Sequence, residues 1–180
     1  YSIYIDNTIN LSLICLFLKK GKVRDSLLSY MAFVTILGSI STIIIPDSCL
    51  VSDILVNIHT MWLHLGSFVV SVYLIMSGVV KLNKKNFFRA IYVFLGFVCI
   101  AFLMNIIVYN SGILNGETFD MFYISPYFIS SLPVFDVIQE SVCYVLFLLI
   151  YIVALSLGAG IIYWISKFIS ICFKRCKKIH

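Results

Sequence analysis

The sequence has few charged residues. Asp, Glu, Lys and Arg make up only 12% of its 180 residues, whereas soluble domains carry about 25%. Hydrophobic residues make up 62% of the chain, and its mean hydropathy is +1.06. A single soluble core of this size cannot bury so much apolar surface. The composition therefore excludes an ordinary water-soluble domain and predicts a membrane protein.

Acidic residues are the scarcer of the charged types, with 8 Asp and Glu against 13 Lys and Arg and a net charge of +5. The basic residues do not form the extended basic face of a nucleic-acid-binding domain. They occur only in short blocks between long apolar runs, at residues 19–24, 81–89 and 167–178. This arrangement is typical of a membrane protein, so no nucleic-acid partner is expected.

Familiar catalytic and ligand-binding motifs are also missing. The chain has no G-x-S-x-G, no H-E-x-x-H and no Gly-rich phosphate loop. Its six cysteines match neither a zinc site nor a disulfide framework, and we predict no metal and no cofactor. No internal repeat is visible, which argues against a secondary transporter, because most transporters are built from repeats.

The apolar residues fall into runs at 1–18, 26–45, 55–80, 88–109 and 141–166. Each run is near or above the ~20 residues that cross a bilayer as a helix. Helix is the expected conformation, because backbone groups in lipid must pair within their own segment. We therefore predict an all-α polytopic transmembrane bundle with five spans, forming a single domain over residues 1–180.

The basic blocks predict the orientation of these spans in the cell membrane. Lys and Arg concentrate on the cytoplasmic side, which places the loops at 19–25 and 81–87 and the C-terminus there. Residue 1, the loop at 46–54 and the segment 110–140 then lie outside. Segment 110–140 is aromatic-rich and interrupted by Pro126 and Pro133, so we predict an interfacial segment. Because Tyr1 already opens an apolar run, we expect further helices upstream.

The third run carries polar residues along one side. At 100° per residue, six of them fall within roughly 80° of one another: Asn57, Thr60, His64, Ser67, Ser71 and Gly78. His59 points about 140° away from His64. The stripe must face other helices or a water-filled cavity, and His64 lies ~13 Å from the outer end of the run, near the bilayer midplane.

Two interpretations of His64 follow. It is a structural histidine bonded to another helix, or it is a catalytic base in a pocket that opens outward. Asn105 is the candidate polar partner of the base. The other predicted pocket-lining residues are Asp6, Asn10, Asn57, Thr60 and Ser67. Asp6 has an alternative interpretation as a solvated residue at the interface. Nucleophile candidates at a similar depth are Cys99, Ser67 and Ser71, none of which has a partner fixed by spacing.

Three segments of the chain resemble a known family: TIIIPD at 42–47, IHTMWLHLGSF at 58–68 and MNIIVYNSG at 104–112. Over residues 8–140 the chain resembles the YwaF-like bacterial integral membrane proteins. These look like distant relatives of a eukaryotic transmembrane acyltransferase that acts on phospholipids, in which a Cys and a His are implicated. The resemblance matches that His to His64, with His59 as the other candidate. The Cys would stand at or just before Tyr1, where this sequence has none.

Three functions stay open at this point. The leading hypothesis is a membrane enzyme that transfers or hydrolyses lipid acyl groups, with the bilayer and its phospholipids as partners. The alternatives are a small-solute transporter subunit and a non-catalytic membrane scaffold, in which the polar stripe serves only helix packing. No oligomeric state is predicted.

Overall fold

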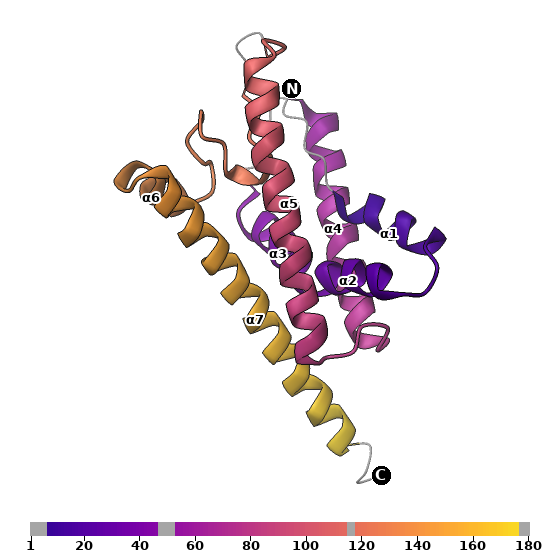
Figure 1. Ribbon diagram of the computed structural model, residues 1–180. Coiled ribbons are helices and arrows are strands. Elements are labelled where there is room, and N and C mark those ends of the chain that lie inside the picture. Colours follow the sequence, from indigo (N-terminus) through magenta and orange to yellow (C-terminus); the bar gives the residue numbers. More distant parts are fainter. Residues whose placement is uncertain (1–6, 47–52, 115–117, 177–180) are drawn as a thin grey trace. The chain divides into compact units, whose positions relative to one another are not determined.

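The computed structural model describes residues 7–46, 53–114 and 118–176, and every regular element within these ranges is a helix (Figure 1). This confirms the all-α fold class. The elements are α1 (Asn7–Phe17), α2 (Lys22–Tyr30), η1 (Met31–Thr35), α3 (Ile36–Ile44), α4 (Ile54–Met76), α5 (Lys84–Asn110), η3 (Met121–Tyr123), α6 (Phe135–Ser141) and α7 (Tyr144–Cys176).

Within the described residues, four helices are long and apolar enough to cross a membrane: Lys22–Ile44, Ile54–Met76, Lys84–Asn110 and Tyr144–Cys172. The predicted five spans are thus one more than the described residues show. The difference lies at the predicted first span, where α1 has only 11 residues and a length of ~16 Å, about half the hydrocarbon thickness. After α1 the chain turns, and the Arg24 side chain donates from Nε to the carbonyl of Cys15 at 2.9 Å.

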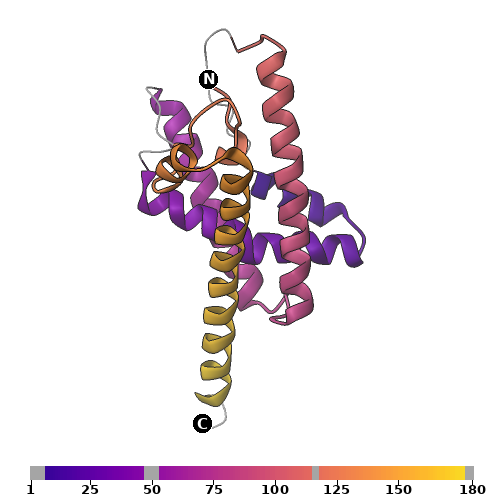
Figure 2. The ribbon, with the colours of Figure 1, turned by 60° about the vertical axis from the view of Figure 1, so that its left-hand side comes forward.

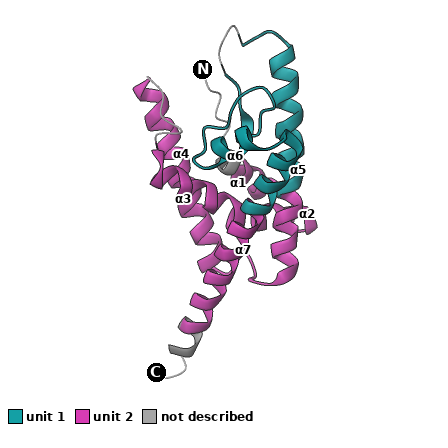
Figure 3. Ribbon diagram, turned by 90° about the vertical axis from the view of Figure 1, so that its left-hand side faces the viewer, with its two compact units in different colours: residues 1–5, 94–154 teal, residues 6–93, 155–180 magenta. Residues whose placement is uncertain are grey.

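The chain divides into two compact units (Figure 3). Unit 1 comprises Tyr1–Ile5 and Phe94–Ala154, and unit 2 comprises Asp6–Val93 and Leu155–His180. Helices α5 and α7 each contribute one part to each unit. The prediction that residues 1–180 form a single domain stays a prediction.

Unit 2 contains one continuous helix made of α2, η1 and α3, which crosses α4 rather than running alongside it (Figures 1 and 2). Its middle, η1, is a π-helical turn. Hydroxyls of Ser29, Thr35 and Ser39 bond back to carbonyls four residues earlier, a contact that loosens and bends helices. Helix α3 ends before Pro46, because proline disfavours helical backbone in the residue that precedes it.

The core of unit 2 forms where η1 meets α5 and α7. The Phe33 ring is fully buried, and its centroid lies 5.7 Å from that of Tyr163 and 6.4 Å from that of Phe87. Helices α3 and α7 approach closely at Gly158, where a larger residue would force the Leu37 side chain to move. A Cβ at Gly158 would lie 2.6 Å from a methyl carbon of Leu37, well inside van der Waals contact.

Helix α4 is bounded by specific capping residues. The Asp53 carboxylate accepts the backbone N–H of Leu55 at 2.8 Å, a standard N-cap contact. At the other end Gly78 has φ +71°, and the N–H of Val80 bonds to the carbonyl of Leu74 at 3.1 Å. A left-handed glycine closes many helices in this way. The helix therefore ends at Met76, before the predicted residue 80.

Unit 1 is built around aromatic side chains of α6 and the start of α7. The Phe135 ring lies 5.3 Å from that of Tyr151 and 6.5 Å from the buried ring of Phe147. The predicted interfacial segment 110–140 holds η3 and most of α6, joined by irregular backbone. The rings of Tyr109 and Tyr127 stack with centroids 3.7 Å apart.

Candidate functional site

Helix α4 has two faces of opposite character. The face exposed in the structure is apolar and runs along the whole helix, and it carries Ile54, Leu55, Ile58, Trp62, Leu65, Val69, Tyr73 and Met76. The buried positions are mostly hydroxyl residues: Thr60, Ser67 and Ser71, with Leu74 below them. A helix with this distribution presents its apolar face to lipid and its polar face to protein.

Ser71 is the centre of the buried contacts between α4 and η1. Its Oγ lies 2.8 Å from the carbonyl oxygen of Met31, 2.7 Å from that of Ser67 and 3.2 Å from Oγ1 of Thr35. The Thr35 hydroxyl also donates to the Met31 carbonyl, at 2.6 Å. A serine hydroxyl has one proton, so Ser71 donates to one carbonyl at a time. We call this group (Met31, Thr35, Ser67 and Ser71) the hydroxyl seam.

His64 occupies the middle of α4, between Thr60 and Ser67 on the same side of the helix. Its side chain is half-buried and takes part in a non-covalent contact, as does that of the half-buried Asn57. His59 differs, because its side chain is exposed. Of the two histidines that the resemblance nominated, His64 is the one beside the buried hydroxyls.

The remaining predicted site residues are distributed differently. Asp6 and the side chain of Asn10 lie outside the described part of the chain. Asn105 and Cys99 belong to unit 1, and Cys99 is exposed. Among the described residues, no three His, Cys, Asp or Glu side chains gather as metal ligands. The predicted pairing of Asn105 with the base stays a prediction.

In unit 1 the Asn105 amide binds the backbone of η3. Its Nδ2 donates to the carbonyl of Met121 at 3.1 Å, and its Oδ1 accepts the N–H of the same residue at 2.8 Å. The side chain is only 1% exposed. Asn105 thus replaces the backbone partner that Met121 would have in a helix or a sheet.

Asp120, beside Met121, is a partly buried carboxylate. One of its oxygens accepts the N–H of Ser125 at 2.7 Å. Burial raises the pKa of this carboxyl from 3.8 to about 6, although backbone hydrogen bonds from Ser125 and Ile124 act in the opposite direction. Asp120 therefore titrates close to neutral pH, unlike an exposed aspartate.

Two further side chains hold the same loop. The Tyr144 hydroxyl donates to the carbonyl of Ile124 at 2.7 Å. The Gln139 amide accepts the N–H of Ser130 at 2.8 Å and donates to the carbonyls of Phe128 at 3.0 Å and Ser125 at 3.3 Å. We call Asn105, Asp120, Gln139 and Tyr144 the loop clamp.

The loop clamp holds strained backbone. Phe122 and Tyr123 have φ of 63° and 58°, the left-handed region that bulky residues avoid. Such residues cost about 1–3 kcal/mol each and persist only where their surroundings enforce them. Sequence reasoning singled out Asn105 but missed Asp120, Gln139 and Tyr144. The sequence pattern around these three residues is weak, because each lies in or beside an irregular segment without helical periodicity.

These features define an α-helical membrane protein with several apolar helices, one of which carries a buried polar face. A family model described as the TMEM164 family matches residues 7–163. The chain therefore belongs to the TMEM164 family, a family of transmembrane proteins. Comparison with curated proteins and with solved structures gives no match. The matched residues include both the hydroxyl seam and the loop clamp, and the finer YwaF-like resemblance stays a prediction.

Proposed function

We propose that this protein is a multi-pass membrane enzyme that transfers or hydrolyses lipid acyl groups, with His64 as its general base. The observation that supports this proposal is the position of His64, half-buried at the middle of an apolar helix of 23 residues and beside buried hydroxyls. Ionisable side chains are costly at this depth in a bilayer, and they usually face a protein interior or a cavity where they have a function.

The chemistry assigned to His64 is proton transfer during attack on a lipid ester. The acceptor is a lysophospholipid hydroxyl for transfer, or water for hydrolysis. The imidazole takes the acceptor proton while the acceptor oxygen bonds to the ester carbonyl carbon. The bond between that carbon and the departing alcohol oxygen then breaks, and the imidazolium returns its proton to this oxygen. Asn57, Thr60 and Ser67 are proposed to line the acceptor site.

The site is proposed to open toward the outer side of the membrane. This follows from the positive-inside rule, because the basic blocks lie at the opposite end of α4 from Asp53. By the same rule, the C-terminus is proposed to lie in the cytoplasm.

The test uses the full chain reconstituted in vesicles that contain a phospholipid with an isotopically labelled acyl chain and an added lysophospholipid. Transfer and release of the label are measured by mass spectrometry. We expect the native protein to move the label and His64→Gln to lower the rate by about 10²–10⁴-fold, the usual contribution of a general base. His59→Gln is the matched control, because this exposed residue lies five positions away on the same helix, and it should leave the rate unchanged. Full activity in His64→Gln would refute the proposed role.

The hydroxyl seam favours a second candidate function, a membrane scaffold. The Ser71 hydroxyl contacts the carbonyls of Met31 and Ser67 and the hydroxyl of Thr35, as expected of residues that pack helices together. Absence of label transfer by the folded native protein, together with unchanged cell lipid composition in a folded His64→Gln variant, would select the scaffold over the enzyme.

A further inference from the structure

Unit 2 brings the basic blocks of the sequence together. Arg89 near the start of α5 lies 3.5 Å from the carboxylate of Asp25 in α2. The Phe87 ring lies 5.4 Å from that of Tyr163 in α7, and Lys167 follows one turn later. The segments 19–25, 81–89 and 163–167 are therefore neighbours in space, although they are far apart along the chain.

Most of the basic side chains in these segments are accessible. The exposed ones are Lys19, Lys20, Lys22, Lys81, Lys84 and Lys85, and the half-buried ones are Arg24, Arg89 and Lys167. Asp25 is the sole acidic residue in these segments. We call the nine Lys and Arg residues just named the basic surface. The basic surface therefore carries a large excess of positive charge, because Asp25 is the only carboxylate in its three segments.

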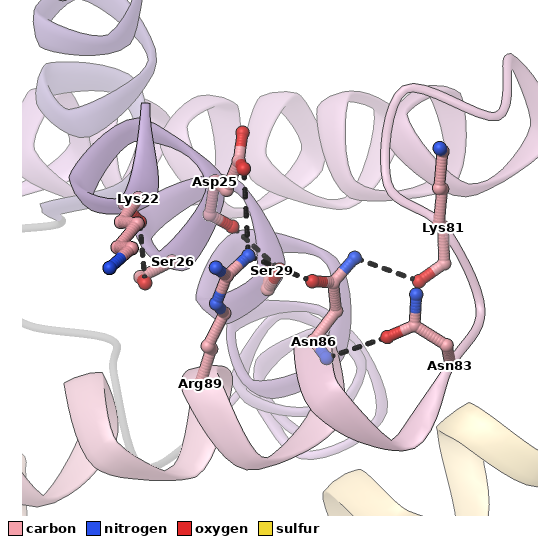
Figure 4. Close-up of polar contacts among 8 residues, drawn as sticks. All are labelled: Lys22, Asp25, Ser26, Ser29, Lys81, Asn83, Asn86 and Arg89. Atoms are coloured by element: carbon pink, nitrogen blue, oxygen red, sulfur yellow. Dashed lines mark hydrogen bonds and ion pairs between the residues drawn. The ribbon is translucent and has the colours of Figure 1, made fainter. Parts of the chain in front are cut away.

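The single carboxylate is already used within the fold (Figure 4). Arg89 donates from Nη1 to Asp25 and, at 3.2 Å, to the side-chain oxygen of Asn86. Asn86 in turn donates to the carbonyl of Lys81 at 3.0 Å, and its backbone N–H bonds to Asn83 at 2.8 Å. This network fixes the turn that carries the lysines of α5. Their ammonium groups have no carboxylate partner among the described residues.

Aromatic residues indicate where this surface lies relative to the bilayer. The Lys167 ammonium stands over the rings of Trp164 and Tyr163, at 5.1 and 5.7 Å from their centroids, and Trp164 is exposed. Trp and Tyr concentrate at the boundary between hydrocarbon and headgroups. A lysine that reaches just beyond such rings extends its charge among the headgroups.

We propose that the basic surface binds the headgroups of anionic phospholipids in the leaflet that it contacts. The phosphate and the net negative charge of such a lipid balance the excess positive charge of the basic surface, and Trp164 places Lys167 at headgroup depth. A zwitterionic headgroup carries its own ammonium and binds this surface more weakly. Basic residues near a membrane surface gain about fivefold in association with anionic lipid per side chain. This proposal does not depend on acyl chemistry at His64.

The test is lipid selectivity of the full chain in phosphatidylcholine bilayers. Trace spin-labelled phosphatidylglycerol and spin-labelled phosphatidylcholine are compared for their association with the protein by electron spin resonance. We expect preference for the anionic lipid, with a decrease at high salt. The triple variant Lys81→Gln, Lys84→Gln, Lys85→Gln should reduce the preference at least about tenfold. The matched triple Lys→Arg variant keeps the charge and should retain the preference.

Two further measurements make the proposal easy to refute. Asp25→Asn removes the competing carboxylate and should raise the anionic preference, so a decrease would contradict the proposal. Inorganic phosphate at constant ionic strength should not abolish the preference. If it does, the surface is a site for a soluble anion instead. Equal association of the two lipids with the native protein, or an unchanged preference in the triple Gln variant, would also overturn it.

Discussion

The hydroxyl seam of unit 2 and the loop clamp of unit 1 are both sets of buried polar side chains, but they bind different kinds of backbone. The seam hydroxyls bond to carbonyls that lie within helices, such as that of Met31 in η1. The loop clamp binds irregular backbone, where Met121 depends on Asn105 for both of its polar groups. A buried polar side chain therefore adds more stability where its backbone partner has no other hydrogen bond. We expect the loop clamp to be the more sensitive of the two.

The largest effect is expected for Asn105→Leu. The leucine fills a similar volume but leaves the N–H and carbonyl of Met121 unpaired in a partly buried place. Each unsatisfied group costs about 1–3 kcal/mol, so we expect a loss of roughly 4 kcal/mol in the free energy of unfolding. Denaturant titration of the purified protein measures the loss, and hydrogen exchange at the Met121 amide locates it.

The matched control is Asn110→Leu. Asn110 lies on the same helix but is exposed, and its Nδ2 donates to Ile106 and Tyr127 at 2.8 and 3.2 Å. Removing it should cost no more than about 0.5 kcal/mol, as usual for a surface substitution. Equal losses in the two variants would contradict the clamp role of Asn105.

A smaller, pH-dependent effect is expected at Asp120. Its folded-state pKa of about 6 exceeds the ordinary value of 3.8, so the folded protein binds this proton more tightly than the unfolded chain does. Its contribution to stability is therefore greatest below about pH 4, decreases as pH rises toward 6 and is level above that. A difference of about two pKa units corresponds to about 3 kcal/mol.

Asp120→Asn isolates this contribution, because an amide does not titrate. Denaturant titrations between pH 4 and pH 7 should show that the native protein loses more stability over this interval than the variant. Parallel pH profiles for the two proteins would show that Asp120 is not the titrating group.

The smallest effect is expected in the seam, for Ser71→Ala. The side chain is fully buried, yet the carbonyls that it contacts belong to helices and keep partners when it is removed. Hydrogen bonds between membrane helices average about 0.6 kcal/mol, and we expect a loss of that size in denaturant titration. Ser77→Ala is the control, since this exposed hydroxyl bonds only to the carbonyl of Tyr73. A loss at Ser71 as large as that at Asn105 would abolish the contrast between the two regions.

Much of the fold followed from local patterns in the chain. The lengths of the apolar runs correctly predicted the four long apolar helices. Helical periodicity placed Thr60, Ser67 and Ser71 on one side of α4, where all three are buried. The predicted first span is the one that the described residues do not show in full, since α1 covers Asn7–Phe17 there. The predicted third span also extended to residue 80, beyond the end of α4 at Met76, because hydropathy does not detect the left-handed backbone of Gly78.

The candidate site was predictable to a similar extent. His64 and the hydroxyl residues stand out because polar side chains are rare within apolar helices. The partners in the seam were not predictable, because Thr35 and Ser71 are 36 residues apart and meet only when η1 packs on α4. Gln139 and Tyr144 were missed for a different reason: the irregular loop that they bind has no periodic pattern.

By itself, the sequence determined that this chain is a helical membrane protein, where its basic residues concentrate and which side of α4 is polar. These properties depend on residue type and on the helical repeat, which act locally. Tertiary structure alone decided that Asn105 holds Met121, that Asp120 is buried enough to titrate near neutral pH and that three basic segments share one surface. These properties depend on which distant segments meet, because burial, charge and hydrogen bonding act through space and not along the chain.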